Sequence, residues 1–488
     1  WTTAALAAAA LALTALVIGG IGGWVKYTRD LERERDVAEA NAAEASEISD
    51  FLIGVFSVAD PEESHGEMIT AREILDRGAE RIERELAERP ETRARLLGIL
   101  GEVYLRLGLH DRARPLLEQS LELTLALPEA SPEAVIEARI RLADLCRTVN
   151  DLDRAEEITG SIPELIASSP DLDPRYAVQA LGCIGRIQID RGRTTEAGET
   201  LSKAVETAEL EIGREAPQVG DLLNDLCYVE QQQRQWDRAI ASCERALEIR
   251  ERAYGPDDPR VATTLNALAN GYRGAGMLEQ AATAGERVLE LRERLLGADH
   301  PRTGTALNNL GLIYKAMGRL DRAEELYLRS LEVRRAAYGD RHPRVAMAYN
   351  NLAGVYRDRG DLDRAEAAHR TALDIYLATL GPDHPDVFYP LAGLGSLAVL
   401  RGDFTEAERY ALRCLRLREA ANGADSPALI GALRVIGEYR IQLGDLDGAE
   451  ESLDRARRIA VDAYGESSDH VTRVDRVIEQ LTEARNEL

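Results

Sequence analysis

The apolar and polar positions of this chain repeat with a fixed period of 42 residues. A turn residue recurs at this period, and an alanine follows it five positions later in all nine copies, from Ala113 to Ala449. The turn residues are Gly108, Asn150, Gly192, Arg234, Gly276, Gly318, Gly360, Gly402 and Gly444. Nine copies without an insertion predict a stacked array in which each repeat buries its apolar face against the next.

Each copy carries the apolar spacing of two helices that pack as a hairpin. In the copy at 303–338, Leu310 and Gly311 lie on the first helix and Ala323 on the second. Small residues at the crossing let two helices approach to about 8–10 Å, and a turn glycine such as Gly318 permits positive φ. The pattern therefore predicts an all-α fold, a superhelical solenoid of antiparallel helix pairs.

A second signal separates the hairpins. Glycines end the second helices, and prolines follow where the next first helix begins, a position at which a missing N–H costs nothing. His300, His342 and His384 each precede such a proline, 42 residues apart. We expect these histidines to be loop or cap residues, because one per repeat is too widely spaced to share a metal.

The N-terminal residues are apolar in a different way. Ala4 to Val25 holds Thr14 as its only conventionally polar side chain, and about 20 residues suffice to cross a ~30 Å hydrocarbon core. This predicts a transmembrane helix over 1–25, with a signal sequence and a buried helix as alternatives. Residues 26–50 are almost wholly charged or alanine, which predicts a juxtamembrane helix. That helix is a spacer or, alternatively, a coiled coil that would make the protein a homodimer.

The repeat phase also predicts the remaining boundaries. Gly66 and Ala71 stand one period before the first full copy, so 51–93 is expected to be a degenerate capping hairpin. Nine repeats then occupy 94–468. Residues 469–488 supply one more first helix, in which Glu479 replaces the small crossing residue, and this predicts a solvated C-terminal cap.

Composition narrows the function. The chain has 60 Lys and Arg against 85 Asp and Glu, a net charge of −25, which argues against nucleic acid as a partner. No Gly-rich phosphate loop, GxSxG or HExxH motif is present, so we expect no catalytic residues, no cofactor and no metal. The five cysteines have no metal-ligand spacing. Cys227 and Cys243 fall on one hairpin, where core filling is favoured and a disulfide is the alternative.

The stretch ALNNLGLIYKAMGRLDRAEELYLRSLEVRRAAYGDRHPRV resembles the tetratricopeptide repeat, in its 42-residue kinesin-light-chain-like variety. The resemblance covers about residue 97 to the C-terminus. It implies a right-handed superhelix whose first helices line a concave ligand face. The expected partner is therefore a protein or an extended peptide.

Two rows of polar residues fall on that implied face. Asparagine is a poor residue for a helix interior, so its recurrence at one phase suggests a role, and an amide can pair with both polar groups of a peptide backbone. The alternative is that the asparagines form hydrogen bonds between adjacent repeats and that the basic residues balance the charge of the surrounding acidic residues. The candidate ligand-binding residues are Asn224, Asn266, Asn308 and Asn350, followed seven positions later by Gln231, Arg273, Lys315 and Arg357.

A second resemblance concerns residues 48–123. Behind an apolar span, this stretch looks like the juxtamembrane and first-repeat region of bacterial membrane-anchored serine/threonine protein kinases. It implies a kinase catalytic domain upstream of residue 1 and a sensory repeat domain outside the bacterial inner membrane. The basic residues Lys26, Arg29, Arg33 and Arg35 lean weakly toward the cytoplasmic side instead. The alternative function is a membrane-tethered scaffold without a kinase.

Overall fold

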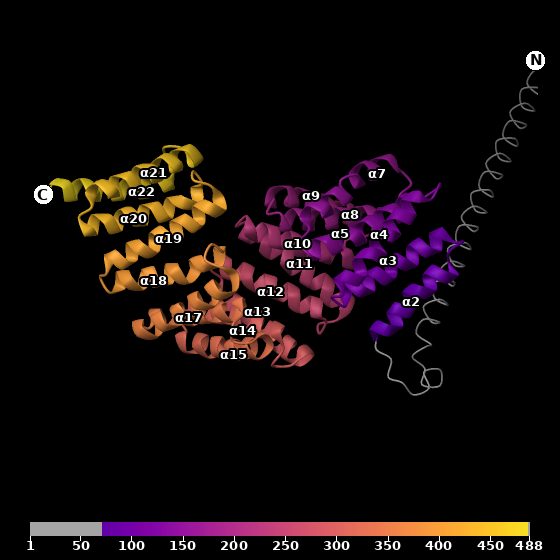
Figure 1. Cartoon of the computed structure of the whole chain (residues 1–488), viewed down its shortest axis with the longest axis horizontal. Coiled ribbons are helices and arrows are strands. Elements are labelled where there is room, and N and C mark those ends of the chain that lie inside the picture. The colour runs from indigo at the N-terminus through magenta and orange to yellow at the C-terminus, as the bar shows by residue number, and fades with distance from the viewer. Residues whose placement is uncertain (1–70, 487–488) are drawn as a thin grey trace, which may run out of the picture. The chain divides into compact units, whose positions relative to one another are not determined.

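The computed structural model describes residues 71–486, and these residues form helices joined by short turns. They divide into two compact units, one ending at Arg214 and one beginning at Glu215, which we call the N-terminal and C-terminal units (Figure 1). The N-terminal unit contains α2 (Ala71–Glu85), α3 (Pro90–Arg106), α4 (His110–Ala126), α5 (Pro132–Thr148), α6 (Leu152–Thr159), α7 (Ile162–Ser168), α8 (Pro174–Asp190) and α9 (Thr194–Glu211).

The C-terminal unit continues the pattern of paired helices. Its first helices alternate with second helices in chain order (Figure 1). Two first helices, α18 and α20, are preceded by a 3-10 turn. The elements are α10 (Pro217–Gln232), α11 (Trp236–Tyr254), α12 (Pro259–Gly274), α13 (Leu278–Leu296), α14 (Pro301–Ala316), α15 (Leu320–Tyr338), α16 (Pro343–Asp358), α17 (Leu362–Leu380), η2 (Pro385–Val387), α18 (Phe388–Leu400), α19 (Phe404–Asn422), η3 (Pro427–Leu429), α20 (Ile430–Leu443), α21 (Leu446–Tyr464) and α22 (Asp469–Asn486).

The turn residues adopt the backbone conformation that the sequence predicts. All nine have positive φ, including Asn150 at 62° and Arg234 at 58°. Positive φ is cheap for glycine and acceptable for asparagine, but it strains a residue such as arginine. The histidines before the prolines are helix caps: the Nδ1 atom of His300 accepts a hydrogen bond from the backbone N–H of Arg302 at 3.1 Å.

The helix crossings are packed through the small residues at fixed phase. Ala113, Ala239, Ala323 and Ala449 are fully buried. A Cβ added at Gly311 would stand 2.7 Å from Cε1 of Tyr327, so only glycine fits there. These contacts confirm the predicted all-α stack of antiparallel pairs. The predicted boundaries at 51–93, 94–468 and 469–488 stay predictions.

The prediction of a transmembrane helix needs correction. No helix among residues 71–486 is long and apolar enough to span a membrane. The helix without any charged residue, α18, has only 13 residues, and at 1.5 Å per residue it reaches about 20 Å. The predicted transmembrane helix and single-pass membrane location therefore have no support among the described residues and are not carried forward. Residues 1–25, 26–50 and the first part of 51–93 lie outside the described residues.

The cysteine prediction also needs correction. Cys227 on α10 and Cys243 on α11 form a disulfide, with their Cα atoms 5.5 Å apart. Both residues occupy the hairpin crossing, where their small side chains meet, so the alternative weighed from the sequence is the one observed. Cys146, Cys183 and Cys414 are buried thiols.

Candidate functional site

One face of the first helices carries the predicted ligand-binding residues. On α14 this face holds Thr305, Asn308, Leu312 and Lys315, whose spacings of three, four and three residues place them in one row. We call the corresponding positions of α10, α12, α14, α16, α18 and α20 the first-helix stripe. All of these helices belong to the C-terminal unit.

The asparagines of the stripe bridge neighbouring first helices. Asn308 is 3% exposed, and its Oδ1 accepts a hydrogen bond from Nδ2 of Asn351 on α16 at 2.8 Å. In the same way, Oδ1 of Asn266 accepts from Nδ2 of Asn309 at 3.0 Å. Each bridge therefore uses the stripe asparagine of one repeat and the residue after the stripe asparagine of the next.

The two end members of the asparagine row have other protein partners. Oδ1 of Asn224 accepts hydrogen bonds from Arg250 at 3.2 Å and from Thr264 at 3.3 Å. Oδ1 of Asn350 lies 3.0 Å from Nδ1 of His369, a buried histidine on α17. Burial lowers the pKa of His369 to about 4, with a further contribution from the nearby positive charge of Arg357.

The second predicted row is less uniform. Gln231 donates a hydrogen bond to the backbone carbonyl of Ala267 at 2.9 Å, which links α10 to α12. Lys315 forms an ion pair with Asp358 at 3.0 Å, and Arg357 pairs with the same carboxylate. Arg273 is exposed and has no carboxylate partner within 4.0 Å among residues 71–486.

The geometry thus gives the two rows different roles. Asn266 and Asn308 bridge neighbouring first helices, and Asn224 and Asn350 have other partners within the fold, which supports the structural alternative for the asparagine row. The basic residues lie at the surface, and Arg273 keeps its guanidinium available. The assignment of all eight residues to a ligand site stays a prediction.

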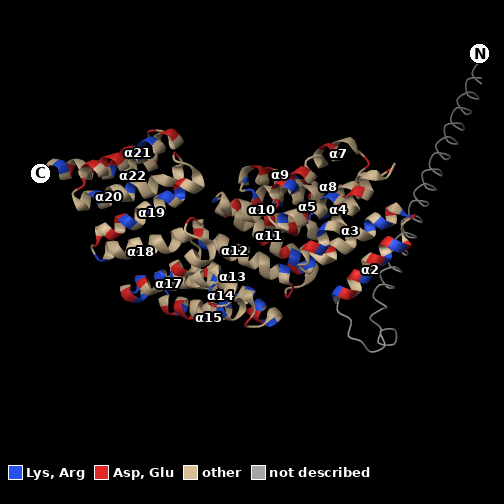
Figure 2. Cartoon of the chain, in the orientation of Figure 1, with Lys and Arg blue, Asp and Glu red and all other residues tan. Residues whose placement is uncertain are grey.

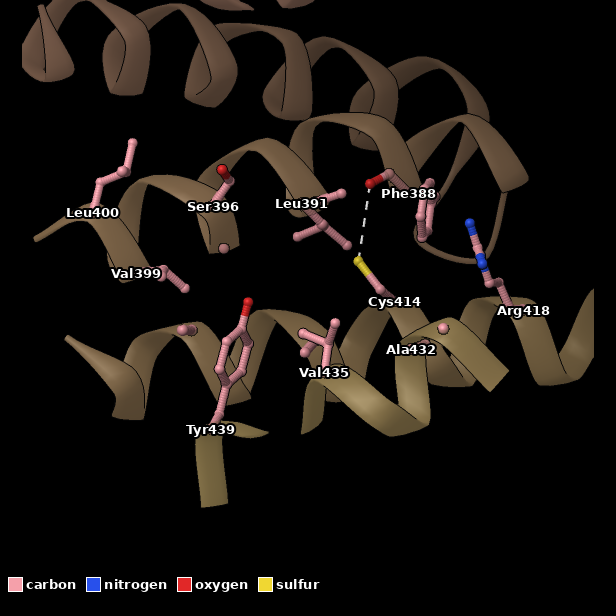
Figure 3. Close-up of a pocket in the computed structure, with 15 residues that line it drawn as sticks. Phe388, Leu391, Ser396, Val399, Leu400, Cys414, Arg418, Ala432, Val435 and Tyr439 are labelled. Carbon is pink, nitrogen blue, oxygen red and sulfur yellow. Dashed lines mark hydrogen bonds between the residues drawn. The ribbon is translucent and has the colours of Figure 1, made fainter. Parts of the chain in front are cut away.

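The sequence prediction missed a cavity further along the same stripe. It has a volume of about 380 Å³ and lies among α18, α19 and α20 (Figure 3). Ala392, Ser396 and Val399 line it from α18, at the register of Asn308, Leu312 and Lys315. We call it the α18–α20 pocket. A search for polar residues in the sequence misses this pocket, because Ala392 and Val399 stand where other repeats have the asparagine and the basic residue.

The N-terminal unit has a hollow of different character. It measures about 450 Å³ and is lined by charged residues of α3, α5 and α8. Arg141 pairs there with Glu137 at 2.6 Å and with Glu102 at 3.4 Å, and Arg147 pairs with Asp190 at 3.1 Å. Figure 2 shows these mixed charges on α3 and α5, whereas α18 in the C-terminal unit carries none. Several charged side chains around the hollow are therefore already paired with one another.

Two solved structures share the fold over most of this chain, and a third matches a shorter part of it. NprR from B. thuringiensis is 18% identical, with a TM-score of 0.53, and the match covers 75% of this chain and 96% of that one. A Rap protein complexed with competence and sporulation factor is 15% identical, with a TM-score of 0.50 and coverage of 80% and 99%. A putative kinesin light chain from Podosopora anserina is 21% identical, with a TM-score of 0.36 and coverage of 41% and 94%.

No curated protein sequence matches this chain. The tetratricopeptide repeat pattern, in contrast, matches residues 92–158 and a series of overlapping segments that together run from 218 to 460. These matches cover most of the chain and coincide with the paired helices of both units. The protein therefore belongs to the tetratricopeptide repeat family.

Proposed function

We propose that this chain binds a protein or an extended peptide along the first-helix stripe of its C-terminal unit. Membership of the tetratricopeptide repeat family supports a role in protein interaction. The Rap protein with this fold was solved in complex with its competence and sporulation factor, so a stack of this kind can hold a partner.

The observation that carries the proposal is that the stripe exposes side chains which the fold does not use. Arg273 on α12 has no ion-pair partner among the described residues. Tyr228, Met347 and Tyr389 lie on α10, α16 and α18 at stripe positions, with exposed fractions of 47%, 39% and 57%. Large apolar groups and an unpaired cation on one face are the composition of a protein-binding surface.

A matched pair of charge reversals tests the proposal. Linear peptides are first selected from a displayed random library on the full chain. The double variant Arg273→Glu with Lys315→Glu is expected to weaken the selected peptides on the order of tenfold or more, because like charges then meet across the interface. The control Arg416→Glu with Arg458→Glu makes the same change in net charge on exposed positions of α19 and α21.

The outcome separates stripe binding from a general charge effect. Peptides that weaken only in the stripe variant support the proposal. Peptides that weaken equally in both variants, or in neither, contradict a site on the stripe. Circular dichroism and thermal unfolding of both variants establish that the helices remain folded.

The finer form of the proposal concerns the wider protein. The resemblance of residues 48–123 suggests that the nine repeats proposed at 94–468 sense a partner for a serine/threonine kinase domain encoded upstream. The alternative is a scaffold that assembles other proteins. The coding sequence before residue 1 decides between them: an in-frame kinase domain supports the sensor, and its absence supports the scaffold.

A further inference from the structure

The α18–α20 pocket exists because one core side chain is missing from a repeated pair. In four of the nine hairpins a crossing glycine on the first helix faces a large side chain on the second, and a Cβ added at that glycine would stand only 2.6 or 2.7 Å from it. Such pairs are Gly101 with Leu117, Gly185 with Leu201, Gly311 with Tyr327 and Gly437 with Leu453. At the same register α18 has Gly395, but α19 has Ala411.

The contacts of Gly395 confirm that the space is empty. A Cβ added there would find its nearest neighbours at 3.4 Å, the Cβ of Tyr410, and at 3.9 Å, the carbonyl oxygen of Ala407. The volume that a leucine fills in other hairpins therefore opens onto the stripe. An unfilled apolar cavity lowers stability by about 24 cal/mol per Å³. Packing of the hairpin therefore does not account for alanine at position 411.

A second glycine widens the mouth of the pocket. Gly431 on α20 is exposed, and a Cβ added at it would have no neighbour within 4 Å. Glycine inside a helix costs about 0.5–1 kcal/mol relative to alanine. Packing does not require glycine at this position, in contrast to Gly437 on the same helix. Two independent positions thus keep the pocket open at the expense of stability.

The lining has a definite chemistry. α18 contains no charged residue, and its Leu391 and Val399 form apolar walls (Figure 3). Arg418, beside Phe388 at one end of the pocket, is the only charged residue among those that line it (Figure 3). In a chain with a net charge of −25, the pocket therefore presents a cation and no carboxylate.

Arg418 retains hydrogen-bonding capacity. Its Nη1 donates to the carbonyl oxygen of Ala428 at 2.9 Å, and its guanidinium stands 4.2 Å from the centroid of the Phe388 ring. Arg334 makes the same bond to the carbonyl of Arg344, so this contact is a strut shared between repeats. The other N–H groups of Arg418 have no carboxylate partner among residues 71–486 and suit an oxyanion.

We propose that the α18–α20 pocket receives one bulky aliphatic or aromatic side chain from a partner protein segment, with an acidic residue beside it that pairs with Arg418. This inference rests on the proposed function, because the pocket continues the stripe on which the partner is placed. An extended segment advances about 3.3 Å per residue and presents alternate side chains to one face. It can therefore lie across successive first helices and bury one anchor in the pocket.

Filling the pocket tests the inference without disrupting the fold. Ala411→Leu restores the glycine–leucine pair that the chain uses in three other hairpins, and Gly431→Leu adds a side chain where space is open. Both variants are expected to keep or raise Tm. Peptides selected on the full chain from a displayed random library are expected to bind them on the order of tenfold to a hundredfold more weakly, as loss of one buried apolar anchor implies.

The matched control is Ala420→Leu, which adds the same volume on the exposed face of α19. It is expected to leave peptide affinity unchanged. Arg418→Gln keeps one donor for the strut to Ala428 and is expected to remove the preference for an acidic residue next to the anchor. Selected sequences are expected to share a bulky apolar residue adjacent to Asp or Glu.

The outcomes distinguish the two levels of the proposal. Peptides that lose affinity in the stripe variant Arg273→Glu with Lys315→Glu, yet bind Ala411→Leu normally, overturn the pocket and leave the proposed function standing. Selected sequences without an apolar–acidic pair overturn the anchor chemistry. Failure to select any peptide on the full chain contradicts the proposed function and the pocket together.

Discussion

The first-helix stripe has two parts built on the same backbone repeat and filled in opposite ways. On α14 the stripe carries Asn308, which is buried in a bridge to Asn351 of α16, and the crossing beneath it is filled by Tyr327 of α15. In the hairpin of α18 and α19 the same positions are Ala392 and Ala411, and a cavity of about 380 Å³ opens among α18, α19 and α20. Two repeats of the same unit, separated by one repeat in the chain, thus differ in whether their surface is closed or open.

The difference shows which residues determine the fold and which determine a site. Turn residues with positive φ and buried alanines recur in every repeat, and they give each hairpin its crossing. The residue opposite the crossing glycine varies between leucine, tyrosine and alanine without changing the hairpin. Binding properties can therefore change from one repeat to the next at constant fold.

The largest difference in stability is expected when the crossing glycine of α14 and that of α18 are each replaced by alanine. Gly311→Ala places a Cβ 2.7 Å from the buried ring of Tyr327, and we expect it to lower the free energy of unfolding by about 3 kcal/mol. Gly395→Ala meets its nearest neighbour at 3.4 Å, and we expect it to raise stability by about 0.5 kcal/mol because helical glycine is replaced. Urea unfolding of both variants measures the contrast, and equal losses would show that the α18 crossing is packed like that of α14.

The next effect depends on pH, at the boundary between the two parts of the stripe. His369 lies beneath α18, where a Cβ added at Gly393 would collide with its ring, and its pKa in the folded protein is lowered to about 4. The unfolded chain has a histidine pKa near 6.5, so it binds more protons between these values and stability falls as pH decreases from about 6.5 toward 4.

Between pH 7 and pH 4.5 this histidine is expected to account for about 2 kcal/mol of the loss in unfolding free energy. His369→Gln removes the titration and keeps a donor for Asn350. Its pH dependence should therefore be shallower than that of the unmodified chain by this amount. Parallel curves would instead mean that His369 is protonated as readily in the folded protein as in the unfolded one.

The sequence predicted the features that recur and missed those that break the repeat. The all-α pairs, the turn residues and the histidine caps follow from period, small residues and proline. The α18–α20 pocket depends on an absent side chain, which can be found only by comparing Ala411 with Leu117, Leu201, Tyr327 and Leu453 at one register. The partners of the stripe asparagines were also unpredictable from spacing, because the bridge uses the following residue, as in Asn351.

A smaller effect is expected from the amide bridges. Asn308→Ala leaves the Nδ2 group of Asn351 without its acceptor, which we expect to cost about 1–2 kcal/mol because that group is half-buried. The double variant Asn308→Ala with Asn351→Ala should lose less than the sum of the two single variants. A double-mutant cycle in urea measures this coupling. Additive losses would show that the asparagines do not brace the first helices, and the ligand-binding interpretation of Asn308 would then regain weight.

The smallest effect on stability is expected at Lys315. This residue best tests whether the stripe stabilises the fold or binds a partner. Lys315 and Asp358 form their 3.0 Å ion pair with side chains that are 25% and 30% exposed. A pair so accessible to water and salt contributes about 0.5 kcal/mol at most. Lys315→Met keeps the apolar stem that packs against Gly354, whose added Cβ would stand 3.1 Å from Cε of Lys315, and should leave unfolding almost unchanged. Peptides that cross α14 on the way to the α18–α20 pocket should nevertheless bind this variant more weakly, and the deficit should shrink as salt screens the charge. A variant that loses stability but binds peptides normally would show that Lys315, like the asparagines, stabilises the packing of the first helices and does not bind the partner.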